Sequence, residues 1–138
     1  MMRDRTEAKG EREQAIGIEE ILKELVRRAL RDCVDIASVA VGDASGLPIV
    51  NATKGKVPVM TYTAMATMSL RAAKTAVEAV GMPPPEYIVV HTAEGLLVVS
   101  TTGTDAVLIA HLRENANLGL ALTVIKKLAA DIGTALET

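Results

Sequence analysis

The chain has 138 residues, about the length of one domain, so we expect a single hydrophobic core. Hydrophobic residues make up 49% and charged residues 23% of the chain, a composition that excludes a disordered protein. The 15 Lys and Arg against 17 Asp and Glu give a net charge of -2. Proteins that bind nucleic acids through phosphate contacts normally show a basic excess, and this chain has none.

Cysteine and histidine are scarce. Cys33 is the only cysteine, which excludes an intramolecular disulfide and a multi-cysteine metal site. The N-terminal residues 1–14 carry four basic and four acidic side chains and no apolar run, unlike a secretory signal. We expect residues 1–15 to form a charged flexible arm before a domain at 16–138. No run approaches the ~18–20 apolar residues of a membrane span, so we expect a cytoplasmic protein.

The first half of the chain predicts a helix followed by a hairpin. Apolar side chains recur every three or four positions over residues 17–32, which predicts an amphipathic helix. Residues 35–42 and 47–52 are rich in alternating and β-branched side chains, as strands are. Between them, Asp43 can bond the turn backbone and Gly46 can take a positive φ. Residues 35–52 therefore predict a β-hairpin.

The second half predicts a long helix, three strands and a final helix. The helix over 57–80 is followed by Gly81 and three prolines, which end helices. Short turns separate the next β-like runs and favour an antiparallel meander: 86–92, 95–101 and 105–112. Residues 117–136 predict the last helix. The order α-β-β-α-β-β-β-α predicts an α+β sandwich, a five-stranded antiparallel sheet with one helix on one face and two on the other.

The predicted helix 57–80 carries two stripes of apolar or small side chains. We expect the stripe of mostly small residues to lie against the sheet: Met65, Met68, Ala72, Ala76 and Ala79. The other stripe is semi-apolar: Met60, Thr63, Thr67, Leu70, Lys74 and Val77. Because the outer side of a monomer's surface helix should be polar, the second stripe favours packing against another copy of the chain. The alternative is that its aliphatic residues are ordinary exposed side chains.

The run 86–92 is apolar on both faces, with Ile88 and Val90 on one and Tyr87 and Val89 on the other. If it is an edge strand, pairing with the same strand of a second copy would satisfy its free backbone groups and join two sheets. If it is an interior strand, it needs no dimer. The sequence alone leaves both arrangements open.

No catalytic, cofactor-binding or metal site is predicted. The chain lacks the glycine-rich phosphate-binding motifs and the common hydrolase and zinc-protease motifs. His91 and His111 lie inside apolar β-like runs, which favours a structural role over a catalytic one. Cys33 follows the first helix, and we interpret it as a small buried hydrophobe rather than a nucleophile. A non-enzymatic protein is therefore expected, and an enzyme that uses Cys33 is the alternative.

Several segments, in this order and spacing, resemble the Roadblock/LC7 family. They are the hairpin Val39–Asn51 with DASGLPI at its turn, EGLLVV at 94–99, TDAVLI at 104–109 and NLGL at 117–120. The similarity extends from about residue 17 to 136, and the charged arm lies outside it. The resemblance implies a profilin-like sandwich that dimerises through the middle helix and the third strand, giving a continuous ten-stranded sheet.

The resemblance also implies a function, a non-enzymatic homodimeric regulator or scaffold of a Ras-like small GTPase. Eukaryotic relatives act in dynein and in lysosomal signalling complexes, and bacterial relatives in polarity control act as dimeric GTPase-activating partners. Short stand-alone members are common in archaea and bacteria. The family has no fixed catalytic motif, so no catalytic residue and no cofactor are transferred to this chain.

Carried onto this sequence, the resemblance places the dimer interface at Met60, Thr63, Thr67, Leu70, Lys74, Val77, Tyr87, Val89 and His91. Contacts with the GTPase are expected at Arg71, Lys74 and Glu78. The implied partners are a second copy or a paralogue and a Ras-like GTPase, with no nucleic acid and no membrane insertion. Two alternatives remain open, a PAS- or GAF-like sensor with a small molecule between sheet and helix, and a purely structural dimerisation module.

Overall fold

The computed structural model describes residues 5–137, with side chains from residue 17 onward. Its elements are α1 (Arg5–Asp32), β1 (Ile36–Gly42), β2 (Pro48–Thr53), α2 (Val59–Ala79), β3 (Tyr87–Thr92), β4 (Gly95–Thr101), β5 (Val107–Arg113) and α3 (Leu118–Glu137). This is the predicted order α-β-β-α-β-β-β-α, and every predicted strand forms.

The five strands form one sheet in the order β2-β1-β5-β4-β3, and every neighbouring pair is antiparallel. The β1–β2 hairpin and the β3–β4–β5 meander therefore meet through β1 and β5, whose side chains are almost all buried. The open question about residues 86–92 is settled, since β3 lies at one edge of the sheet and β2 at the other.

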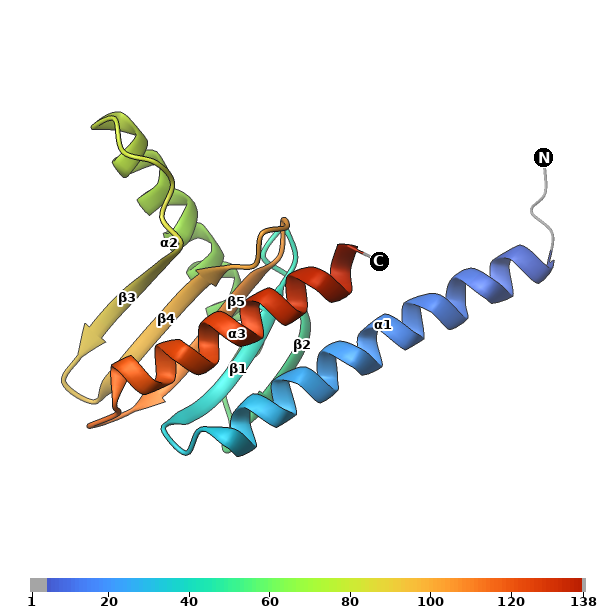
Figure 1. The fold of residues 1–138 in the computed structure, drawn as a ribbon, viewed down its shortest axis with the longest axis horizontal. Coiled ribbons are helices and arrows are strands. Elements are labelled where there is room, and N and C mark those ends of the chain that lie inside the picture. Colours follow the sequence, from blue (N-terminus) through green and yellow to red (C-terminus); the bar gives the residue numbers. More distant parts are fainter. Residues whose placement is uncertain (1–4, 138) are drawn as a thin grey trace.

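The helices divide between the two faces of the sheet as expected. In Figure 1, α1 and α3 cross in front of the sheet and α2 lies behind it. The larger core lies under α1 and α3 and includes Leu22, Val26, Leu108, Leu112, Ile125 and Ile132. The smaller core lies under α2 and includes Ala40, Ala66, Leu70, Val99, Val107 and Ile109. The α+β sandwich with one helix on one face and two on the other is confirmed.

α1 is longer than predicted. It begins at Arg5, so its backbone passes through most of the segment that we expected to be a charged arm. Residues 1–4 of that segment, and the side chains of residues 5–16, lie outside the described part of the chain. The periodicity placed the start near residue 17 because an apolar stripe marks only the part of a helix that packs on a core.

The β1–β2 turn has the predicted chemistry. One carboxylate oxygen of Asp43 accepts hydrogen bonds from the Ser45 hydroxyl at 2.6 Å and from the Ser45 and Leu47 amides at 2.9 and 3.1 Å. These bonds lower the pKa of Asp43, and the bond from the Ser45 hydroxyl has the largest effect. Gly46 has φ 88°, a conformation that glycine adopts without strain.

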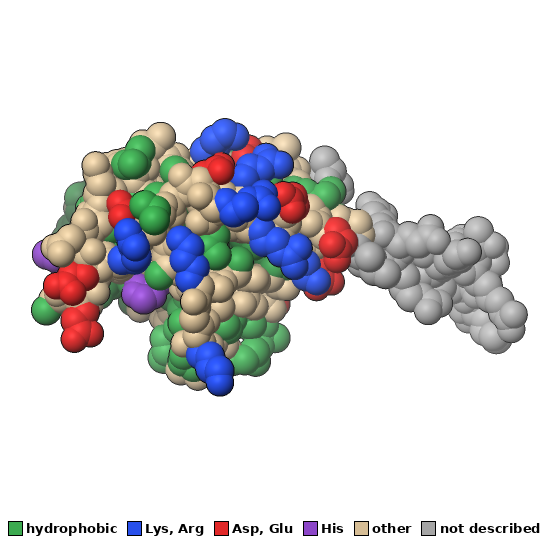
Figure 2. Space-filling model, turned by 90° about the horizontal axis from the view of Figure 1, so that it is seen from below, with side chains coloured by type: hydrophobic (Ala, Val, Ile, Leu, Met, Phe, Trp, Pro, Cys, Tyr) green, Lys and Arg blue, Asp and Glu red, His purple; other side chains and the backbone are tan. Residues whose placement is uncertain are grey.

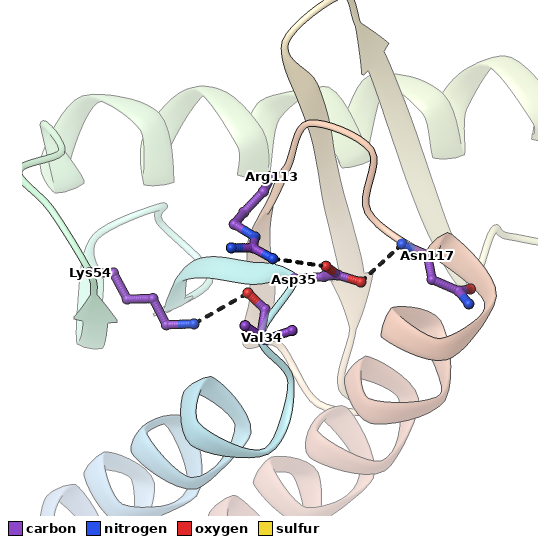
Figure 3. A network of polar contacts seen from close by, with 5 residues as sticks. All are labelled: Val34, Asp35, Lys54, Arg113 and Asn117. Atoms are coloured by element: carbon purple, nitrogen blue, oxygen red, sulfur yellow. Dashed lines mark hydrogen bonds and ion pairs between the residues drawn. The ribbon is translucent and has the colours of Figure 1, made fainter.

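The carboxylate of Asp35, in the loop after α1, ties this loop to β5 and to the start of α3 (Figure 3). One oxygen of Asp35 accepts a bond from the Arg113 guanidinium at 3.3 Å, and the other accepts one from the Asn117 amide at 3.0 Å. The Asn117 bond is the main reason that the pKa of Asp35 is lowered. Asn117 in turn caps α3, because its side-chain oxygen accepts a bond from the Leu120 amide at 3.1 Å.

Candidate functional site

The candidate site is built on α2 and the neighbouring edge strand β3. α2 contacts the sheet through four residues that are almost fully buried, Thr63, Ala66, Thr67 and Leu70. The Thr67 hydroxyl donates to the Thr63 carbonyl at 2.8 Å. The hydroxyl of this buried threonine is therefore satisfied within the helix, so it can face the sheet at little cost.

Two glycines allow α2 to lie this close to the β1–β2 hairpin. A Cβ atom at Gly42 would lie 2.7 Å from Cγ2 of Thr63, and one at Gly46 would lie 3.2 Å from Cα of Ala64. Real Cβ atoms essentially never approach a neighbour as closely as the first of these distances. The glycines therefore select the threonine side of α2 as the side that fits the sheet.

The predicted orientation of α2 is wrong. The stripe expected against the sheet faces outward, with Met65 54% and Met68 57% exposed. Leu70, which we expected to face a partner, is 6% exposed and packs in the core under α2. Both stripes have helical spacing and similar apolar content, so periodicity could not distinguish them. The close contact at Gly42 and Gly46 decides between them, and it joins segments distant in sequence.

The residues predicted at the dimer interface fall into three groups. The first group is buried within the chain and leaves no side-chain surface for a partner: Thr63, Thr67 and Leu70. The second group is exposed: Met60, Lys74 and His91. The third group is half-buried: Val77, Tyr87 and Val89. The predicted GTPase contacts Arg71, Lys74 and Glu78 are all exposed on α2. Tyr87 and Val89 pack against the core under α1 and α3, and the Lys126 ammonium lies 5.5 Å from the Tyr87 ring centroid.

Sequence reasoning missed part of the apolar surface. Of the ten exposed large hydrophobic residues in the described part of the chain, six lie on α2, just after it or on β3: Met60, Met65, Met68, Val80, Met82 and Val90. Apolar side chains also gather at the bottom of the view in Figure 2, on the side that carries α2. The sequence showed both faces of the 86–92 run to be apolar, but the predicted interface included Val89 and left out Val90.

The C-terminal half of α2 has no sheet beneath most of it. In Figure 1 this end of the helix extends past the end of the sheet. From Arg71 to Val80 every residue is exposed except Ala73 and Val77, which are half-buried. The helix ends as predicted at Gly81, which has φ 79°. The Gly81 amide donates to the Glu78 carbonyl at 3.0 Å and the Met82 amide to the Val77 carbonyl at 2.9 Å, as in a Schellman cap.

A small cavity lies between the start of α2 and the sheet. It has a volume of about 200 Å³ and is lined by Ser38, Val57, Pro58, Tyr62, Leu97 and His111. Burial raises the pKa of Tyr62, and the nearby Ser38 hydroxyl offsets part of that rise. The two hydroxyls do not meet hydrogen-bond geometry, and both are buried without a partner among the described residues.

A metal site and a reactive cysteine find no support among residues 17–137. No group of three or more His, Cys, Asp or Glu side chains in this range could hold a metal ion. Cys33 is 4% exposed, in accord with the interpretation as a buried hydrophobe. No described helix is both long enough and apolar enough to cross a membrane.

Comparison with solved structures identifies the fold. The gliding protein mglB from Thermus thermophilus superimposes with a TM-score of 0.80 at 18% identity, over 87% of this chain and 91% of that one. MglB from Myxococcus xanthus superimposes with a TM-score of 0.77 at 18% identity, over 84% of this chain and 94% of that one. A Roadblock/LC7 domain from Streptomyces avermitilis superimposes with a TM-score of 0.76 at 18% identity, over 84% of this chain and 98% of that one. By sequence, the chain matches no protein-family model and no curated protein.

Proposed function

We propose that this chain, which has the Roadblock/LC7 fold, is a non-enzymatic homodimer that regulates or tethers a Ras-like small GTPase. The family resemblance of the sequence implies this role. The observation that carries it is the concentration of exposed apolar side chains on α2 and β3. Exposed apolar side chains gathered on neighbouring elements mark interaction surfaces, because a monomer gains nothing by exposing them.

The two edges of the sheet differ, and the difference supports pairing through β3. β2 starts at Pro48, its pairing with β1 is shifted in register at Val41/Gly42, and Lys54 follows it directly. Proline, bulges and lysine all protect an edge from further pairing. β3 pairs with β4 in an unbroken register from Tyr87 to Thr92. Its outer backbone groups can therefore pair with the same strand of a second copy, as the family resemblance implies.

α2 supports the same dimer. Ala73 and Val77 follow Leu70 by three and seven residues, so they continue its side of the helix. This side covers the chain's own sheet as far as Leu70 and then extends past it (Figure 1). In a dimer joined through β3, the next sheet under this end of α2 belongs to the second copy. The proposed interface therefore loses Thr63, Thr67 and Leu70 from the predicted set. It keeps Val77 and β3, and it gains Ala73 and Val90.

The outward stripe of α2 is then the proposed surface for the GTPase. Met65, Met68 and Ala72 face away from the sheet, and methionine side chains adapt well to the surface of a partner. Arg71, Lys74 and Glu78 are exposed beside this stripe and supply charges for orientation. In a two-fold dimer the two stripes lie on one face, which provides a continuous surface for the switch regions of a GTPase.

Size-exclusion chromatography with light scattering tests the dimer. The wild-type protein should have twice the 14.5 kDa chain mass. Val77→Glu or Val90→Glu places a charge in the interface, which should weaken the dimer about 100-fold or more. Both should remain folded by circular dichroism. Leu120→Glu, at an α3 residue that is 57% exposed, is the matched control and should stay dimeric. If the Val77→Glu variant and the Val90→Glu variant both stay dimeric, this interface is refuted.

A pull-down from native lysate, with GDP or a non-hydrolysable GTP analogue, tests the GTPase partner. We expect a Ras-like GTPase to be enriched in one nucleotide state. Met68→Glu should lose it while remaining a dimer, because Met68 faces away from the proposed interface. If only the chain itself or a paralogue is recovered in both nucleotide states, the dimer proposal stands and the GTPase proposal is rejected.

The cavity beside Tyr62 favours one second candidate, a small-molecule sensor. The cavity lies between sheet and helix, where that alternative places its ligand. Its volume of about 200 Å³ is below the ~300–1,000 Å³ of typical ligand pockets, so only a small metabolite would fit. A thermal-shift screen tests this candidate, because a specific ligand stabilises the folded protein saturably. Loss of that shift in Leu97→Trp, which fills the cavity, would assign the ligand to this place.

A further inference from the structure

A groove at the C-terminal end of α1 lies on the other face of the sheet from α2. It has a volume of about 430 Å³ and is lined by Arg27, Leu30, Arg31, Val34 and Lys54. The first three residues belong to α1, Val34 lies in the loop after it, and Lys54 follows β2 directly. The groove therefore joins residues from three places in the sequence. Figure 2 shows many Lys and Arg side chains on the half of the surface that carries α1 and α3.

The charge of the groove is positive. Three of its five lining residues are cationic and none is acidic. Arg31 already pairs with Glu24 outside the groove, with an N–O distance of 3.0 Å. Arg27 and Lys54 form no ion pair within the described residues. They can therefore bind an added carboxylate without first breaking an internal ion pair.

Lys54 is held in position beside the groove (Figure 3). Its ammonium donates to the Val34 carbonyl at 3.5 Å, which draws the side chain toward the loop after α1. The acid of that loop, Asp35, is committed, because its two oxygens accept bonds from Arg113 and Asn117. Two donors of the ammonium are left for a ligand.

The other two lining residues of the groove, Leu30 and Val34, are apolar. Leu30 is half-buried, and Val34 is 65% exposed. An exposed valine is ordinary by itself, but here it lies inside a concave surface with cations around it. We propose that this groove binds an acidic peptide segment of a partner protein, whose carboxylates pair with Arg27, Arg31 and Lys54 while one apolar side chain packs on Val34.

Charge and shape favour a peptide over other anionic partners. Anionic membranes are recognised by clusters of ~4–8 Lys and Arg, and the groove has three. Single-stranded nucleic acids require aromatic side chains for base stacking, and no aromatic residue lines the groove. A short acidic peptide with one apolar residue at its centre matches both the cationic and the apolar lining of the groove. This proposal concerns a different surface from α2 and β3, so it stands or falls separately from the proposed function.

Fluorescence anisotropy with the fluorescein-labelled peptide EELEE tests the proposal. Binding should weaken about tenfold in Lys54→Glu and in Arg27→Glu, because each reversal replaces an attraction by a repulsion. Val34→Ser should weaken it less, and peptide EESEE should bind more weakly than EELEE. Raising the salt from about 50 to about 500 mM should reduce binding, since the cations are solvent-exposed. Lys74→Glu makes the same charge change on α2 and should bind EELEE like the wild type.

Three results would overturn the proposal. The first is equal binding of EELEE by Lys54→Glu and Lys74→Glu, which would place binding elsewhere or make it nonspecific. The second is no binding of EELEE even at the lower salt concentration. The third is a wild-type protein that binds no peptide but sediments with phosphatidylserine vesicles, while the Lys54→Glu variant does not sediment. This result would assign the groove to membrane binding. All the substituted side chains are exposed, so circular dichroism should show each variant folded.

Discussion

Truncation of Leu70 tests the orientation of α2 most directly. Leu70 is 6% exposed and packs with Ala66, Val99 and Ile109 in the core under α2. Leu70→Ala removes these contacts and leaves a cavity that the rigid sheet cannot close. Buried Leu→Ala substitutions cost ~2–5 kcal/mol, and we expect about 3 kcal/mol in the free energy of unfolding. Met68→Ala, at a side chain 57% exposed, should change it by less than about 0.5 kcal/mol.

Urea unfolding followed by far-UV circular dichroism measures both effects. The free energy of unfolding of a dimer depends on concentration, so all variants should be compared at one protein concentration. The slope against urea should be the same for the three proteins, because the surface exposed on unfolding hardly changes. The expected result is a clear shift of the midpoint for Leu70→Ala and almost none for Met68→Ala.

The reverse pattern would refute the orientation. If Met68→Ala cost about 3 kcal/mol and Leu70→Ala less than about 0.5 kcal/mol, the methionine stripe would face the sheet. The interface would then return to the threonine stripe. Equal, large losses at both positions would indicate that a second copy covers Met68 as fully as the sheet covers Leu70, and would move the proposed GTPase surface elsewhere.

Two further predictions concern packing and pH. Gly133→Ala should lower the free energy of unfolding by about 2 kcal/mol, because its Cβ would collide with the Thr102 carbonyl oxygen. Gly119→Ala lies in the same helix, and its Cβ would meet only Asn117 Oδ1 at 3.6 Å, an ordinary contact. It should instead be neutral or up to ~1 kcal/mol stabilising. Thermal unfolding separates the two variants, and a Gly133→Ala protein as stable as the wild type would contradict the contact. The lowered folded-state pKa of Asp35 means that its contribution to stability is present above the pKa of the unfolded state and is lost as pH falls through the folded value. Asp35→Asn should therefore destabilise the protein at neutral pH and flatten the acid side of its stability profile, and an unchanged profile would show that the Asn117 bond carries no such linkage.

Much of the fold could be predicted because it depends on local patterns. Period-two alternation identified the strands, and the turn at Asp43 and Gly46 formed as its residue types require. Gly81 ended α2 where the sequence placed it. These signals depend on backbone conformation and short-range hydrogen bonds, which a few neighbouring residues determine.

The candidate site depended instead on contacts between distant segments. Which stripe of α2 faces the sheet is decided by the close approach of Thr63 to Gly42, and two similar stripes cannot reveal that contact. The edge position of β3 follows from the pairing of β1 with β5. The groove exists because β2 brings Lys54 beside α1. Sequence periodicity records which residues share a face, but only tertiary packing decides what that face meets, because that depends on shape complementarity between segments far apart in the chain.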